Sequence, residues 1–209
     1  MSLRNLTATL LLSCLAAVAA GAPSHPLAAD GADAASPLAL VQGTQLGKSL
    51  FADGDTARGG RGQTVDGIEG SSSEMLNTHI HAHLSIFYNG QQVAVPRGVG
   101  ILPPFRVSDG FVEGGKGFYW LHTHDATGIL HIESPDKRVY TLGNFFDVWG
   151  EPLTATNVAG LKGPTRVYVN GRMQFGNARD LPLKAHDQIA LVIGRPAVSP
   201  AQYAFPDGL

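Results

Sequence analysis

Six of the chain's eight histidines lie between residues 77 and 135, in three short runs: Thr78–Leu84, Trp120–Asp125 and Leu130–Glu133. Within each run, a histidine or a carboxylate alternates with an apolar or small residue. Residues i and i+2 of a β-strand point to the same face, so each run predicts a strand with its polar side chains ranked on one side. Imidazole nitrogen and carboxylate oxygen both bind divalent transition metals, so this spacing predicts a metal site.

The second and third runs flank Asp125-Ala126-Thr127-Gly128, which is typical of a four-residue hairpin loop. Pairing across this loop would place His122 opposite His131 and Trp120 opposite Glu133. Directly opposed side chains have Cβ atoms about 4.5–5.5 Å apart. We therefore expect imidazoles from both runs to converge on one surface.

The predicted ligands, of which a site would use three or four, are His81, His83, His122, His124, His131 and Glu133. Asp125 is a further carboxylate that could bind the ion or orient an imidazole. We expect His79, the first histidine of its strand, at the edge of the site, and His186, far along the chain, at the surface. With imidazole ligands the expected ion is copper or zinc, and iron or nickel also fit this ligand chemistry.

The first histidine run belongs to a predicted hairpin. His79–Tyr88 and Gln91–Val95 flank Asn89-Gly90, a strong signal for a two-residue turn. Such a turn places Ile86 opposite Val93, which aligns the apolar sides of both strands. The histidines then occupy the opposite face from this apolar side.

The remaining elements predict a β-rich α+β fold. The pattern favours strands at 138–142, 165–169, 172–175 and 187–194, and a short helix at 143–150 that ends at Gly150 and Pro152. The expected architecture is an antiparallel or mixed sheet built from hairpins, with one short helix. An all-β two-sheet sandwich is the alternative.

Residues 1–20 have the features of a signal peptide, with Arg4, an apolar stretch and small residues before a cleavage site near Ala20. Cleavage would remove Cys14, the chain's one cysteine, and leave no thiolate ligand. We expect a secreted or periplasmic protein with a flexible low-complexity linker at 21–70 and a single domain at 71–209. No later stretch is long and apolar enough to span a membrane. The formal net charge of −2, without a basic run, gives no indication of a nucleic-acid partner.

Three strings of residues carry a resemblance to a known family. They are His-x-His-x-His-Leu, Leu-His-Thr-His-Asp-x-x-Gly-x-x-His-x-Glu-x-Pro and Thr-Leu-Gly-x-Phe-Phe-x-x-Trp-Gly. Together they resemble a family of exported prokaryotic proteins of uncharacterised function, over residues 63–209. The resemblance implies one domain in the mature chain and transfers no activity.

Three functional interpretations follow from the sequence. The first is an exported protein that binds copper or zinc without catalysis. The second is a metal-dependent enzyme: a hydrolase with three histidines and a bound water, or an oxygenase with two histidines and Glu133. The third is a structural or interaction domain whose histidines face solvent and bind no metal. The sequence contains no G-x-S-x-G or H-E-x-x-H string that would decide for an enzyme.

Overall fold

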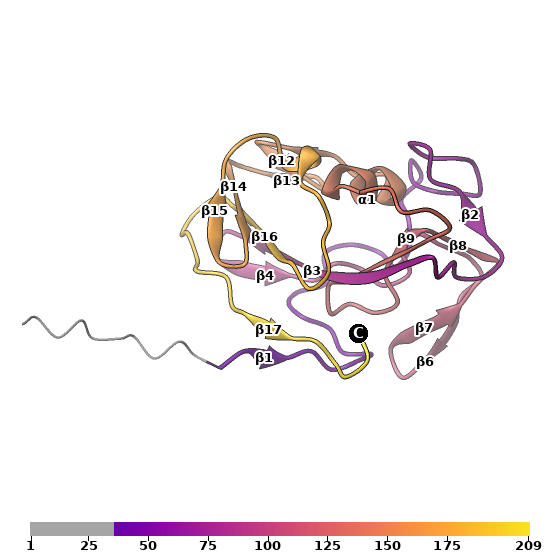
Figure 1. Ribbon diagram of the computed structural model, residues 1–209. Helices are drawn as coiled ribbons and strands as arrows, with labels where there is room; N and C mark the ends of the chain where they lie inside the picture. The colour runs from indigo at the N-terminus through magenta and orange to yellow at the C-terminus, as the bar shows by residue number, and fades with distance from the viewer. Residues whose placement is uncertain (1–35) are drawn as a thin grey trace, which may run out of the picture. The chain divides into compact units, whose positions relative to one another are not determined.

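The three histidine runs lie in one seven-stranded mixed sheet of the computed structural model, which describes residues 36–209. The strands of this sheet are β3 (Thr78–Tyr88), β4 (Gln91–Val93), β9 (Leu121–His122), β10 (Ile129–Ser134), β14 (Thr165–Val169), β15 (Arg172–Gln174) and β16 (Gln188–Ile193). Their order is β15-β14-β16-β3-β10-β9, and β4 also pairs with β3 (Figure 1). The central strand β3 runs antiparallel to β10 and parallel to β16.

Shorter elements surround this sheet. The strands are β1 (Leu38–Ala39), β2 (Gly70–Ser71), β5 (Ile101–Leu102), β6 (Arg106–Ser108), β7 (Phe111–Gly114), β8 (Gly117–Tyr119), β11 (Leu153–Thr154), β12 (Asn157–Val158), β13 (Leu161–Lys162) and β17 (Tyr203–Ala204). The helices are α1 (Leu142–Trp149) and the 3₁₀ helix η1 (Ala178–Asp180). One α-helix packed on a mixed sheet confirms the predicted β-rich α+β fold.

The alternation in β3 divides its side chains as predicted. Ala82, Leu84 and Ile86 lie in the main hydrophobic core. Ile86 pairs with Val93 of β4, which confirms the register expected from the Asn89-Gly90 turn. Both turn residues have positive φ angles, the backbone conformation that a type I′ hairpin turn requires.

Helix α1 (Leu142–Trp149) forms within one residue of the predicted helix at each end, but the strand predicted before it does not form. The Thr141 hydroxyl accepts a hydrogen bond from the backbone N–H of Asn144, whose side chain in turn accepts one from the N–H of Thr141. This capping box starts the helix, and no strand forms at 138–142. The helix ends at Gly150 in the left-handed conformation, as the sequence indicated. Its buried face includes Phe145, Phe146 and Trp149.

The compact unit of the structure spans Ser36–Leu209. Residues 36–70, where a flexible linker was expected, therefore contact the rest of this unit. The Phe51 ring lies edge-on to Trp149 with 5.1 Å between centroids, and the N–H of Gly60 donates to Val148. The predicted signal peptide at 1–20 lies outside the described residues.

The histidine side of the sheet is covered rather than solvent-facing. Figure 1 shows α1 on one side of β3 and the β1–β17 pair on the other. Tyr203 of β17 packs on His83 with ring centroids 4.4 Å apart, and Phe111 of β7 stacks on His124 at 4.6 Å. Both histidines are buried as a result.

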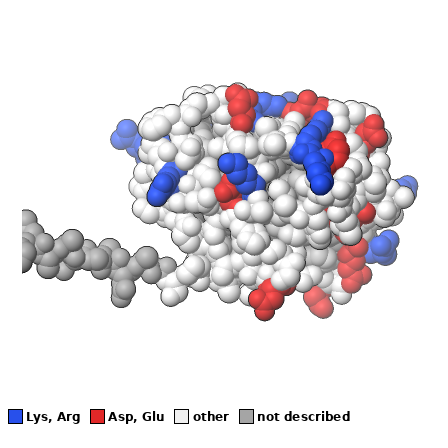
Figure 2. All heavy atoms as spheres, in the orientation of Figure 1, with Lys and Arg blue, Asp and Glu red and all other residues white. Residues whose placement is uncertain are grey.

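Figure 2 shows basic and acidic side chains mixed over the upper part of this face and mainly acidic ones along its lower edge. Among residues 36–209, no helix has the length and apolar character needed to cross a membrane.

Candidate metal centre

The strand register places three histidines in a row across three strands. His81 of β3 pairs with His131 of β10, and His131 pairs with His122 of β9. The pairing of His122 with His131 is the one that the sequence predicted. In the next row, Glu133 of β10 pairs with His79 of β3. The three histidine runs therefore meet on one face.

His122, His124 and His131 form a buried group that could hold a metal ion. Each offers a ring nitrogen, and these nitrogens lie within 4.8 Å of one another. The His122 and His131 rings are stacked with centroids 5.2 Å apart, and the His124 ring stands nearly perpendicular to His131 at 4.6 Å. All three side chains are buried, so water competes little for their nitrogen atoms.

Backbone carbonyls fix two of these rings in one tautomer. His122 Nδ1 lies 2.9 Å from the carbonyl oxygen of Tyr119, and His124 Nδ1 lies 2.6 Å from that of Val112. A carbonyl oxygen can only accept, so each Nδ1 carries the proton and each neutral ring has its lone pair on Nε2. The two Nε2 atoms are 3.1 Å apart.

This contact is favourable only with a positive charge between the rings. Two lone pairs at this separation repel unless a proton or a metal ion is shared between them. Two nitrogens bound to one tetrahedral zinc ion at its usual bond length would lie about 3.3 Å apart. The His122–His124 spacing is therefore close to that of a ligand pair.

Burial keeps His122 and His131 in the protonation state that binds metal. Burial, reinforced by the neighbouring His124, lowers the pKa of His122 to about 3. Burial likewise holds the pKa of His131 well below its ordinary value. Both rings are neutral at pH 7, and neutral imidazole is the form that binds metal.

Glu133 is the buried carboxylate of the cluster. Its Oε1 accepts a hydrogen bond from His131 Nδ1 at 3.0 Å, which leaves His131 Nε2 free to bind an ion. Oε1 also lies 3.5 Å from His79 Nε2 and 4.0 Å from His81 Nε2. Burial, with Glu74 nearby, raises the pKa of Glu133 to about 7. His79, His81 and Glu133 form a second group of potential ligands.

Two of the predicted polar residues face elsewhere. His83 pairs with Ile129 rather than with a histidine, and its Nε2 donates to the carbonyl oxygen of Thr127 at 2.8 Å. The Asp125 carboxylate accepts hydrogen bonds from the N–H groups of Gly43 and Thr127, so it fixes the loop and does not contact an imidazole. The structure brings neither residue into the cluster.

The structure adds one residue that the sequence did not indicate, Glu74, and brings His79, expected at the edge, into contact with the cluster. Glu74 Oε1 lies 3.4 Å from His124 Nε2, and the proximity of His124 lowers the pKa of Glu74. A single glutamate in a serine-rich loop has no periodicity that could have indicated this role. His79, expected at the edge, contacts Glu133 although its side chain is 44% exposed. His186 is exposed, as expected.

A cavity of about 420 Å³ borders the cluster. Its lining residues are Gln42, Glu74, His79, His81, Phe111, Glu113, His124, His131, Glu133 and Leu209. The otherwise buried imidazoles are therefore accessible to a small solute from this side.

Comparison of the chain with protein-family models, with curated proteins and with solved structures found no match. The resemblance to a family of exported proteins therefore stays a prediction.

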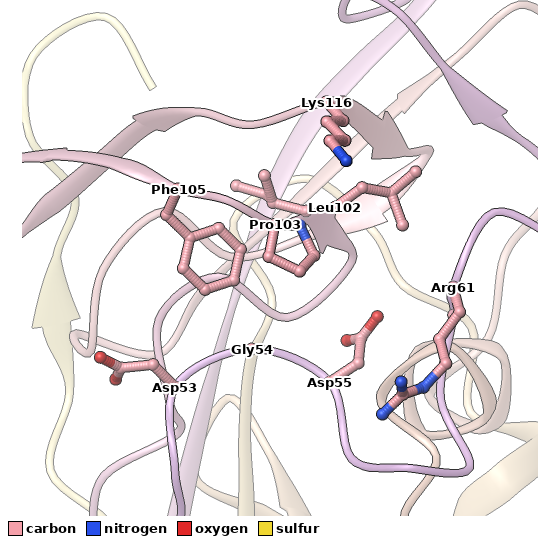
Figure 3. A pocket seen from close by; sticks show the side chains of 10 residues that line it. Asp53, Gly54, Asp55, Arg61, Leu102, Pro103, Phe105 and Lys116 are labelled. Carbon is pink, nitrogen blue, oxygen red and sulfur yellow. The ribbon is translucent and has the colours of Figure 1, made fainter.

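A cavity of about 440 Å³ lies apart from the histidines and shares no lining residue with the one beside them. Figure 3 shows Asp55 facing Leu102 and Pro103 there, with Arg61 beside it. Asp55 Oδ1 accepts a hydrogen bond from the N–H of Gly100 at 2.7 Å, whereas Oδ2 is buried without a hydrogen-bond partner among the described residues. Burial raises the pKa of this carboxyl to about 7.

Replacing Asp55 with asparagine is expected to stabilise the protein at pH 8 and to have little effect at pH 4. The folded-state pKa of about 7 exceeds the unfolded value of 3.8, so wild-type stability falls as the pH rises between them. At about 1.4 kcal/mol per pKa unit, and allowing for partial exposure, the gain at pH 8 is about 2 kcal/mol. Urea unfolding at both pH values measures it. Equal effects at pH 4 and pH 8 would contradict the pKa, and Asp53→Asn, at a more exposed carboxylate, is the control.

Proposed function

We propose that this protein is an exported metal-binding protein that holds a copper or zinc ion between His122, His124 and His131. The observation that carries this proposal is the 3.1 Å contact between two Nε2 lone pairs in a buried site. A divalent cation replaces their repulsion with two bonds, and the third imidazole completes a three-histidine ligand set. Glu133 supports the set by orienting His131.

The choice of ion follows from the donors. Nitrogen and carboxylate oxygen without a thiolate suit zinc and copper(II), and the general affinity order favours copper(II). Export is supported by the signal-peptide features of residues 1–20, and an exported protein meets both ions outside the cytosol. A secreted or periplasmic metal-binding protein is therefore the function that we propose.

A hydrolytic enzyme is the second candidate, and the adjoining cavity favours it. Three histidines leave a coordination position for water, whose pKa a zinc ion lowers to about 7. Glu74 lies at the cavity beside His124 and could accept a proton from that water. Turnover of a chromogenic ester by the zinc-loaded protein, lost in Glu74→Gln with its zinc retained, would support this candidate over storage or transport.

Metal content tests the proposal directly. We expect the exported protein, purified without an affinity tag, to contain or take up at least one Zn²⁺ or Cu²⁺ per chain, with a dissociation constant below about 1 μM, or more than about 8 kcal/mol of binding free energy. Elemental analysis and isothermal titration calorimetry measure both quantities. A proton shared between His122 and His124 would instead give no stoichiometric metal, even after incubation with either ion, and that result would overturn the proposal.

A further inference from the structure

Three overlapping groups of potential ligands lie around Glu133, and the third, made of Glu74, His122 and Glu133, shares one residue with each of the other two. His122, His124 and His131 form the inner set, and His79, His81 and Glu133 form the outer set. Within residues 36–209, no group with ligand atoms inside 4.8 Å joins His79 or His81 to His122 or His124. Nitrogens that share one ion lie closer together than this, at about 3–4 Å. A single ion therefore cannot bind His79 and His81 together with His122 and His124, whereas Glu133 is within reach of both pairs.

Glu133 lies between the two sets: Oε2 faces His122, and Oε1, which also accepts the hydrogen bond from His131 Nδ1, faces the outer histidines. Its Oε1 lies 3.5 Å from His79 Nε2 and 4.0 Å from His81 Nε2. Its Oε2 lies 3.9 Å from His122 Nε2 on the other side. A carboxylate whose two oxygens face two groups of nitrogen donors has the arrangement of a bridging ligand in two-metal sites.

Two buried atoms of this arrangement have no hydrogen-bond partner among the described residues. They are His81 Nε2 in the outer set and Glu133 Oε2, which faces the inner set. Both side chains are more than nine-tenths buried. A buried polar atom without a partner costs about 1–3 kcal/mol, so each such atom in a native structure calls for a ligand or water. One ion in each set would supply the missing partners of both atoms.

We propose that the cluster binds two divalent transition-metal ions, with the Glu133 carboxylate bridging an inner ion on His122, His124 and His131 to an outer ion on His79 and His81. This inference rests on the proposed function and extends it to a dinuclear centre. His79 is 44% exposed, whereas His81 and the three inner histidines are buried. The outer ion is therefore the weaker and more exchangeable of the two.

Titration with Zn²⁺ followed by calorimetry and elemental analysis tests the second site. We expect two ions per wild-type chain, one tight and one at least tenfold weaker. His79→Ala, a change at a partly exposed side chain, should remove the weaker ion and change the tight affinity less than threefold. His186→Ala, at an exposed histidine outside both sets, is the matched control and should keep two ions. Circular dichroism confirms that each variant is folded.

Each result decides between the two proposals. One ion in the wild type with an unchanged titration for His79→Ala overturns the second site and leaves the three-histidine site standing. Two ions that both persist in His79→Ala also overturn the outer site as placed here. No bound ion in the wild type overturns both proposals. Electron paramagnetic resonance of the Cu²⁺-loaded protein adds a test of the bridge, since coupled copper ions support it and uncoupled ions contradict it.

Discussion

Replacing His122 with alanine is expected to weaken the tightest Zn²⁺ binding by about 100- to 1000-fold. Structural zinc sites with four ligands bind with about 10–16 kcal/mol, or about 2.5–4 kcal/mol for each ligand. At about 1.4 kcal/mol per factor of ten, losing one ligand has this effect. His122 is the residue to change because its Nδ1 is fixed by Tyr119 and its Nε2 faces His124. Competition with a chelator of known affinity measures the change.

His83→Gln is the matched control for this prediction. His83 is buried on the same face of the sheet, yet its Nε2 donates to Thr127 and it belongs to neither ligand set. The variant should lose stability while its Zn²⁺ affinity changes less than threefold. At 1000 times its dissociation constant, Zn²⁺ adds about 4 kcal/mol to the free energy of unfolding of the wild type. Thermal unfolding with Zn²⁺ should show most of this stabilisation in His83→Gln and little of it in His122→Ala. Equal affinities of wild type and His122→Ala would exclude His122 as a ligand.

Replacing Trp149 with alanine is expected to lower the free energy of unfolding by about 3–5 kcal/mol, the usual cost of truncating a large buried aromatic side chain. Trp149 is 1% exposed and contacts Phe145 and Phe146 of its own helix. It also contacts Phe51, so its loss would loosen the segment before the sheet. Urea unfolding measures the stability, and trypsin cleavage near Arg58 and Arg61 measures the loosening.

Phe175→Ala is the matched control, since that aromatic ring is 92% exposed. The change there should alter stability by less than about 0.5 kcal/mol, as surface substitutions usually do. If Trp149→Ala cost no more than Phe175→Ala, the core described around α1 would be wrong. If trypsin cut wild type and Trp149→Ala equally fast, residues 51–61 would not depend on Trp149 for their packing.

The dinuclear proposal changes how the cavity beside the cluster is understood. With one inner ion, the cavity is an entrance to a storage site. With an exchangeable outer ion on His79 and His81, it becomes the place where an ion is received, or where a substrate meets two metals. The Glu74→Gln variant separates these uses when it keeps its zinc, because Glu74 lines the cavity beside His124 and is not one of the three proposed histidine ligands.

The sequence by itself determined the elements that carry the site. The period-two pattern of β3 placed Ala82, Leu84 and Ile86 in the core and His79 and His81 on the other face. The Asn-Gly turn and the four-residue loop predicted the pairing of Ile86 with Val93 and of His122 with His131. These predictions succeeded because strand alternation and turn geometry depend on residues that are close in sequence.

Only the tertiary structure decided which histidines face one another and what covers them. His83 has the same spacing as His81, but its ring donates a hydrogen bond to Thr127 and packs on Tyr203. Glu74 joins the cluster from a loop whose sequence has no periodic pattern. The sequence placed the histidines on an open sheet face, yet packing from segments distant in sequence buries most of them. Such contacts depend on the shape of the fold and on how the chain is routed, not on sequence periodicity. Burial by these segments lowers the pKa of His122 and leaves Glu133 Oε2 without a hydrogen-bond partner among the described residues.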